Sequence, residues 1–383
     1  MIPIPRLLTP LLVVGLWTLI GGLPLQAQTP LPADAPRALK QFDTNLSNTT
    51  IDLSELRRGA PKDGIPAIDN PSFVTIDMAS KWIDAREPVI AIEHNGVARA
   101  YPLQILTFHE IVNDDIGGTP VAVTFCPLCY SAIAFKRTLD GEPVTFGVSG
   151  LLRNSDLVMY DRKTETLWQQ FTGQAIAGTR AGETLDLISS QILSFKQFGN
   201  NYPDGKVLSR KTGHRRPYGQ NPYAGYDDVD KPPFAFDRPV DDRLPPKEKV
   251  VAVSVGETHK GYPHPTTKRK RVIHDTVADR PLVVFHAPGA VSALDARRIS
   301  ASKEDGTTGV FDRRVNGRTL RFEYAGERFK DTQTGSVWTV AGRAVEGPMT
   351  GTQLVPITHG NYFAFSWFAF RPNAALYGAD AEL

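Results

Sequence analysis

Short runs in which apolar and polar positions alternate recur along most of the chain. This alternation predicts β-strands, listed here by residue range: 89–93, 121–125, 132–137, 144–148 and 157–161. Helical periodicity is scarce, and short helices are expected only near 77–84, 103–112 and 186–195. Gly (32) and Pro (30) are frequent, which favours short strands joined by turns. The pattern therefore predicts a mainly β protein.

The same order of residues occurs twice along the chain. Tyr101-Pro102 recurs as Tyr262-Pro263, and the hairpin signal Asp140-Gly141 recurs as Asn316-Gly317. The clearest match aligns Asp161-x-x-Thr164-x-Thr166-x-Trp168 with Asp331-x-x-Thr334-x-Ser336-x-Trp338. We therefore predict two tandem, diverged copies of a small β-barrel or sandwich module with a few short helices.

The repeat and its flanks divide the chain into six predicted parts. They are a signal peptide (1–27), an N-terminal extension (28–84), a first β module (85–190), an aromatic and basic connecting arm (191–247), a second β module (248–360) and a C-terminal segment (361–383). The arm is too long for an ordinary connection. Its tyrosines favour an arm laid against the first module.

The first residues have the pattern of a secretory signal. Arg6 precedes the apolar run 7–20, and Leu25-Gln26-Ala27 provides a small-residue cleavage site. The run is too short for a comfortable membrane helix, so no membrane span is expected after cleavage and the predicted location is periplasmic or secreted. Lys plus Arg (43) nearly balance Asp plus Glu (41), which argues against a nucleic-acid partner.

The chain has only two cysteines, Cys126 and Cys129, and they form a C-x-x-C in the first copy. In the second copy their positions hold His286 and Gly289, so the fold does not require the thiols. By the same comparison Asp114 is matched by Asp275, which indicates a structural role for both. The thiol pair is therefore the main candidate for chemistry.

Several interpretations of the thiol pair remain open. Cys126, Cys129 and His109 as a third ligand would suit Cu(I) or Zn, in an exported protein that stores a metal or exchanges it with a partner protein. The same pair could be a thiol-disulfide oxidoreductase centre, although a strand rather than an activating helix follows it. It could also be an inert disulfide in a structural or ligand-binding module, or a pair of thiols without function. Whether the protein is an enzyme stays open.

A second candidate site lies in the arm. His214, Arg215 and Arg216 stand together, and paired guanidinium groups suit a carboxylate or phosphate. The alternative is a solvated charged loop. A small anionic ligand is the corresponding partner prediction.

Five segments occur in an order that resembles a known family. They are Asp63-Gly-Ile-Pro66, Tyr101-Pro-Leu103, His109-Glu-Ile-Val-Asn-Asp114, Thr124-Phe-Cys-Pro-Leu-Cys129 and Phe146-Gly-Val-Ser-Gly150. With them the chain resembles the uncharacterised prokaryotic family called domain of unknown function 3179, from about residue 55 to 360. The resemblance implies that these segments belong together and implies no activity.

Overall fold

The chain folds mainly into short β-strands, as predicted. The computed structural model describes residues 35–378, in which no helix is longer than seven residues. None of the helices in this part is long and apolar enough to cross a membrane. The predicted signal peptide lies outside the described residues.

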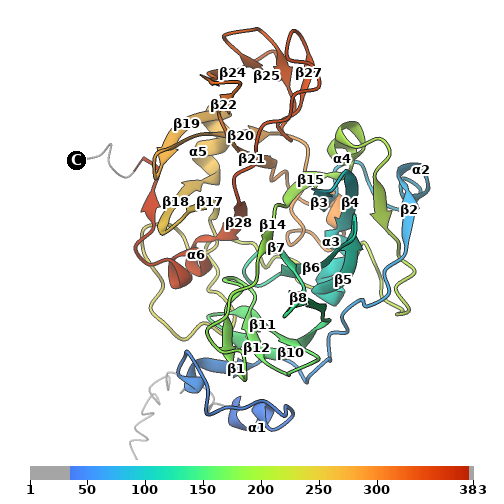
Figure 1. Ribbon diagram of the computed structural model, residues 1–383, viewed down its shortest axis with the longest axis vertical. Helices are drawn as coiled ribbons and strands as arrows, with labels where there is room; N and C mark the ends of the chain where they lie inside the picture. Colours follow the sequence, from blue (N-terminus) through green and yellow to red (C-terminus); the bar gives the residue numbers. More distant parts are fainter. Residues whose placement is uncertain (1–34, 379–383) are drawn as a thin grey trace, which may run out of the picture. The chain divides into compact units, whose positions relative to one another are not determined.

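Three sheets are built mostly from the first half of the chain (Figure 1). One has the order β15-β3-β4-β16-β2, the second β14-β7-β6-β5 and the third β1-β10-β11-β12-β13. Their strands are β1 (Leu56–Arg58), β2 (Phe73–Thr75), β3 (Pro88–His94), β4 (Val97–Pro102), β5 (Ile111–Ile116), β6 (Thr119–Cys126), β7 (Ser131–Lys136), β10 (Phe146–Arg153), β11 (Asp156–Asp161), β12 (Leu167–Gln169), β13 (Ala175–Ala177), β14 (Leu187–Ile188), β15 (Gln191–Ser194) and β16 (Lys206–Leu208). The helices of this half are α1 (Ala35–Leu39), η1 (Leu53–Glu55), α2 (Ile76–Ala79), α3 (Leu103–His109) and α4 (Phe195–Asn201).

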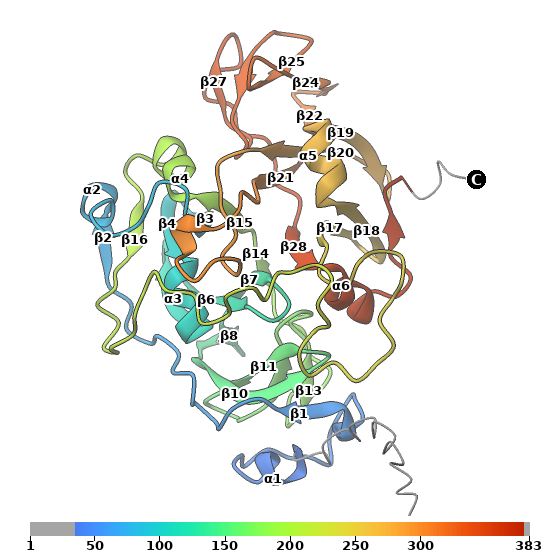
Figure 2. The same ribbon diagram turned by 180° about the vertical axis from the view of Figure 1, so that it is seen from behind.

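The second half has sheets with a similar order of pairing. They run β28-β17-β18-β29, β19-β20-β21 and β24-β25-β26-β27. The strands are β17 (Lys249–Val255), β18 (Thr258–Pro263), β19 (Val272–Val277), β20 (Arg280–Ala287), β21 (Thr307–Asp312), β24 (Phe322–Ala325), β25 (Arg328–Asp331), β26 (Val337–Trp338), β27 (Ala344–Glu346), β28 (His359–Phe363) and β29 (Ala375–Leu376). The helices are α5 (His264–Lys270), η2 (Ile299–Ala301) and α6 (Ala364–Phe370), and Figure 2 shows this half from behind.

Two small hairpins form where the turn residues predicted them. β8 (Thr138–Leu139) pairs with β9 (Glu142–Pro143), and β22 (Arg314–Val315) pairs with β23 (Arg318–Thr319). The turn residues Asp140 and Gly141 have φ of 50° and 79°, and the second hairpin has nearly the same values. Positive φ at both positions explains why Asp-Gly and Asn-Gly stand there.

The helix predicted near 186–195 is wrong. β14 and β15 occupy this stretch, and β15 pairs antiparallel with β3 along its whole length. The helix α4 begins only at Phe195, because the Ser194 hydroxyl accepts from the Gln197 backbone N–H and the Gln197 side chain accepts from the Ser194 N–H. Such a capping box marks a helix start, so the residues before it are free to extend the sheet.

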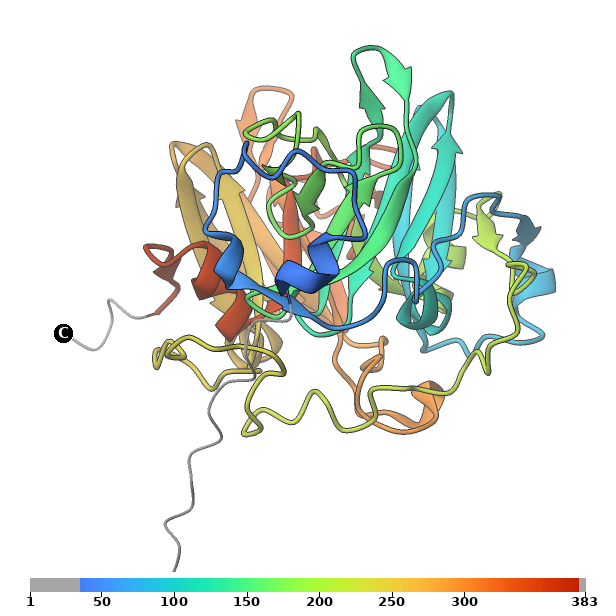
Figure 3. The same ribbon diagram turned by 90° about the horizontal axis from the view of Figure 1, so that it is seen from below.

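Residues 209–248 contain no helix or strand and run along both halves (Figure 3). The Tyr226 hydroxyl donates to the Leu128 carbonyl in the first half, and the Asn221 N–H donates to the Arg297 carbonyl in the second. The arm therefore contacts the first module, as its tyrosines predicted, and the second as well.

One apolar core joins residues of both halves. It holds Cys126 and Cys129 together with Phe363, Phe365 and Trp367 from β28 and α6. The rings of Phe171 and Tyr362 lie 4.6 Å apart, centroid to centroid, across this junction. The two predicted modules thus share a core around the cysteines.

Candidate metal centre

The C-x-x-C forms the loop between β6 and β7. Cys126 is the last residue of β6 and pairs with Ser131, the first residue of β7. Tyr130 closes the loop with a positive φ of 58°. The Cys129 carbonyl accepts from the Phe363 N–H at 3.0 Å, so the second half helps to fix the loop.

A carboxylate that the sequence analysis missed joins the two thiols. Asp156 begins β11, directly after the two-residue turn Asn154-Ser155, whose φ values of 52° and 65° are both positive. This tight hairpin turn points Asp156 into the core, where it is completely buried. The Asn-Ser pair before an apolar run was the available signal, but nothing local shows that this strand end meets the cysteines.

Cys126, Cys129 and Asp156 form a compact cluster of candidate ligands. Their two sulfur atoms and one carboxylate oxygen all lie within 4.8 Å of one another. The cysteines are 4.2 Å apart and both thiols are free, whereas a disulfide has sulfur atoms about 2.05 Å apart. The two cysteines therefore do not form the predicted inert disulfide in this structure.

Neighbouring groups hold the carboxylate in place. The Asp156 Oδ2 atom accepts from the Gln169 side-chain amide at 2.6 Å and from the Phe171 N–H at 2.9 Å. The thiols of Cys126 and Cys129 point at the Ser155 carbonyl oxygen, at 3.8 and 3.4 Å. Hydrogen bonds to ligand residues are typical supports of a metal site, because they fix the orientation of the ligands.

Burial governs the protonation of the cluster. It raises the pKa of Cys126, and it raises the pKa of Cys129 well above the ordinary range. It also raises the pKa of Asp156 to about 7, although the bonds from Gln169 and Phe171 act in the opposite direction. Neutral thiols are weak nucleophiles, so a metal would have to displace protons from this cluster.

Glu110 adds a second buried acid near the cluster. It ends α3 with a φ of 57°, where the chain turns into β5. Burial raises the pKa of Glu110 to about 8, and the Asp156 carboxylate contributes to the rise. Glu110 in turn raises the pKa of Cys126. No role was predicted for Glu110 from the sequence.

His109 is not part of the cluster, which corrects the predicted third ligand. Its Nδ1 atom donates to the Pro66 carbonyl at 2.8 Å, and its Nε2 atom lies 2.6 Å from the Tyr218 hydroxyl. Burial lowers the pKa of His109 to about 4, so the ring is neutral and Nε2 accepts from Tyr218. Both ring nitrogens of His109 are therefore engaged in hydrogen bonds. His109 and Glu110 are consecutive at the end of α3 and point different ways, Glu110 towards the cluster and His109 towards the arm.

The predicted anion site lies on the surface of the arm. His214, Arg215 and Arg216 are exposed, and the His214 ring is 5.3 Å from the His109 ring. This placement is compatible with both the anion site and the solvated loop, so the prediction stays untested.

The residues shared by the two halves make matching contacts. The Tyr101 hydroxyl donates to Asp114 at 2.6 Å, and the Tyr262 hydroxyl donates to Asp275 at 2.9 Å. These bonds explain why an aspartate is kept at both positions.

Comparison with known proteins gives a family and no activity. A model of the family described as "Protein of unknown function (DUF3179)" matches residues 62–374. No curated protein and no solved structure matches the chain. Function has to be argued from the site itself.

Proposed function

Because the chain belongs to the DUF3179 family of proteins of unknown function, we propose from its site alone that it binds a metal ion through Cys126, Cys129 and Asp156. The observation that carries the proposal is the mutual distance of the three ligand atoms, within 4.8 Å. Ligand atoms 2.0–2.3 Å from one tetrahedral ion are about 3.5–4 Å apart. Only a small contraction of the cluster separates it from that geometry.

The ligand types favour zinc over copper. Two thiolates suit both Cu(I) and Zn(II), but a carboxylate is a hard ligand that suits Zn(II) better. Three protein ligands leave the fourth tetrahedral position open. When bound, a zinc ion supplies Lewis acidity and can lower the pKa of a water molecule in that position.

A thiol-disulfide oxidoreductase is the second candidate. The free thiols, 4.2 Å apart, support it, because a small movement would allow a bond to form. Burial argues against it, since Cys126 is 1% exposed and Cys129 is 0% exposed. A partner thiol has no access to such groups, and their raised pKa values suppress the reactive thiolate.

Metal analysis of the purified protein tests the proposal. After anaerobic purification and zinc reconstitution, we expect one zinc per chain in the wild type, and loss of zinc in Cys126→Ser and Asp156→Asn. His109→Ala is the matched control and should keep its zinc, because the His109 ring is bonded to Pro66 and Tyr218. A wild type that takes up no metal, or an Asp156→Asn variant with full metal content, would refute the proposed site.

We also infer that the two halves are diverged copies of one module. Matching hydrogen bonds support this inference: the Trp168 Nε1–H donates to Asp161 at 3.0 Å, and the Trp338 Nε1–H donates to Asp331 at 2.9 Å. An experimental structure in which the two halves fail to superpose would contradict it.

Export from the cytoplasm is a further proposal, and it rests on the N-terminal sequence. The arginine and apolar run at the start of the chain have the pattern of a cleaved signal. N-terminal sequencing of the mature protein should give a start near Gln28. An intact N-terminus on protein recovered from the cytoplasm would contradict the proposal.

A further inference from the structure

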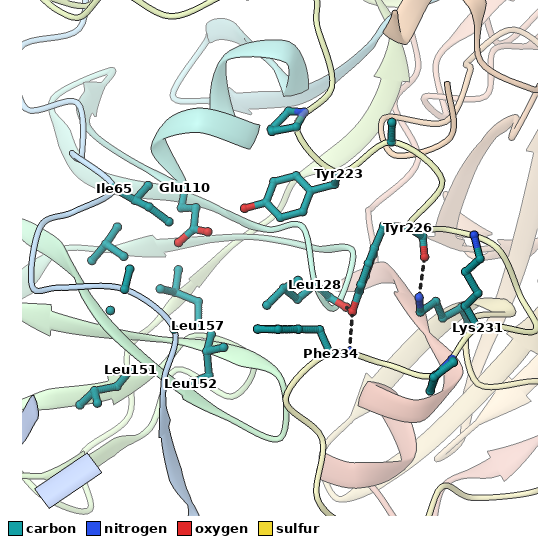
Figure 4. Close-up of a pocket in the computed structure, with 18 of the residues that line it drawn as sticks. Ile65, Glu110, Leu128, Leu151, Leu152, Leu157, Tyr223, Tyr226, Lys231 and Phe234 are labelled. Atoms are coloured by element: carbon teal, nitrogen blue, oxygen red, sulfur yellow. Dashed lines mark hydrogen bonds between the residues drawn. The ribbon is translucent and has the colours of Figure 1, made fainter. Parts of the chain in front are cut away.

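A cavity of about 650 Å³ lies beside the cysteine loop (Figure 4). It is walled by segments far apart in the sequence: 59–65, 148–157 and 222–234, with Glu110 and Leu128 between them. Its volume is in the range of sites for small organic molecules. Most of the lining side chains are apolar, including Leu128, Leu152 and Leu157.

Two polar groups face this apolar space without a partner. The Glu110 carboxyl and the Tyr223 hydroxyl both line the cavity and point toward each other (Figure 4). Among residues 35–378 neither group has a hydrogen-bond partner, although Glu110 is only 7% exposed. Neither oxygen is among the fully buried unpaired atoms of the described residues, because both border the cavity. A hydrogen-bonding group of a molecule in the cavity can therefore reach them.

The lysines near the cavity are already engaged. Lys247 donates to the Tyr226 carbonyl at 2.7 Å and lies 3.7 Å from the centre of the Tyr226 ring. Lys231 pairs with Asp228 at 3.4 Å. Lys231 is thus paired with an acid, Lys247 is held against Tyr226, and Glu110 stands in the wall, so the lining favours a neutral molecule over an anion.

The arm forms the outer wall and the opening. Phe234 lines the cavity although it is 56% exposed, which places its ring at the opening. The Phe234 N–H donates to the Tyr226 hydroxyl, which itself donates to the Leu128 carbonyl. The opening is thus tied to the cysteine loop by two hydrogen bonds.

We propose that this cavity binds a neutral, mainly apolar organic molecule whose single hydroxyl group hydrogen-bonds to Glu110 and Tyr223. Its hydrocarbon part lies against Leu128, Leu152 and Leu157. The high pKa of Glu110 agrees with this, because a protonated carboxyl can both donate to and accept from a hydroxyl. The proposal goes beyond the metal site and does not depend on it.

Binding of 4-propylphenol and propylbenzene, measured by isothermal titration calorimetry, tests the proposal. We expect the wild type to bind both and to prefer the phenol by roughly fivefold or more, because one hydrogen bond usually contributes about fivefold and the hydroxyl makes two. Glu110→Met replaces the carboxyl by an apolar chain of similar length. It should bind propylbenzene as the wild type does and lose most of the preference for the phenol.

A cavity-filling pair provides the control. Leu152→Trp should abolish binding of both compounds, because Leu152 lines the cavity. Val355→Trp carries the same new side chain at an exposed position and should bind like the wild type. No saturable binding by the wild type, or equal affinity for the two compounds, overturns the proposal. Neither outcome alters the zinc content, so the cavity proposal can be refuted while the zinc site stands, and the reverse.

Discussion

Replacement of Glu110 by Gln removes a buried acid whose protonation the fold controls. The folded chain holds the pKa of Glu110 at about 8, against an ordinary value of 4.5. The stabilisation that the protonated Glu110 side chain gives to the fold is therefore complete below pH 4.5, and it is lost as the pH rises to about 8. In that window the unfolded chain releases the proton while the folded chain keeps it, which favours unfolding by about 1.4 kcal/mol per pH unit. At pH 7 the accumulated cost is about 3 kcal/mol.

Urea unfolding of the wild type and Glu110→Gln between pH 4 and pH 8, in the presence of a chelator, measures this cost. The two free energies of unfolding should be similar at pH 4, and the variant should be more stable by about 3 kcal/mol at pH 7. Asp156, whose pKa is raised to about 7, is present in both proteins. Its effect on the free energy of unfolding therefore cancels to first order in the difference between them.

Glu142→Gln is the matched control for the direction in which stability changes with pH. Glu142 is exposed, and its hydrogen bond and ion pair with Lys163 lower its pKa. Its stabilisation exists above the ordinary pKa, so the variant should lose rather than gain stability as the pH rises, and by a small amount. A difference between the wild type and Glu110→Gln that stays constant from pH 4 to pH 8 would show that Glu110 ionises normally, and the argument about its burial would be wrong.

Three further predictions concern the buried polar groups. Asp161→Ala and Asp331→Ala should each lower the free energy of unfolding by about 3–5 kcal/mol. Each change leaves a buried tryptophan N–H and a threonine N–H without their acceptor. A loss below about 1 kcal/mol in urea unfolding would contradict this. Lys249→Met should cost about 3–5 kcal/mol, because it leaves Asp305, whose side chain is only 15% exposed, without its cation at 2.5 Å; adding Asp305→Leu should restore most of it. In the metal-free protein both thiols should react with Ellman's reagent only as fast as the fold opens; rapid labelling of the folded protein would contradict their burial.

Local signals predicted the strands and turns well. β3, β6, β7 and β11 lie within two residues of the predicted ranges, because alternation and paired turn residues act over a few positions. The strand predicted at 144–148 is displaced, since β10 runs from 146 to 153. Long-range pairing was not visible. The predicted boundaries at 190 and 360 detach β15 and most of β28 from the modules, although β15 pairs with β3 and β28 pairs with β17. Which distant strand completes a sheet is decided by tertiary packing that no local pattern records.

The candidate site was half predicted, for the same reason. The C-x-x-C was found because two thiols are rare in this chain, and a rare reactive residue is visible in a sequence. Asp156 was missed because aspartate is common, and only the turn of β10 into β11 brings it to the cysteines. His109 was chosen for its residue type, but the fold uses its ring to hold Tyr218.

Comparison of equivalent strand ends separates the residues that hold the fold from those that serve the site. The bond from tryptophan to aspartate occurs in both halves, so it belongs to the fold. Cys126 is the last residue of β6, and His286 is the residue before the last of β20. The Nε2 atom of His286 is buried without a partner beside Gly306. The strand end therefore accepts a thiol in one half and an imidazole in the other while the pairing of strands is unchanged. The cluster of Cys126, Cys129 and Asp156 therefore has no counterpart at the aligned positions His286 and Gly289, which favours a functional rather than a folding role for it.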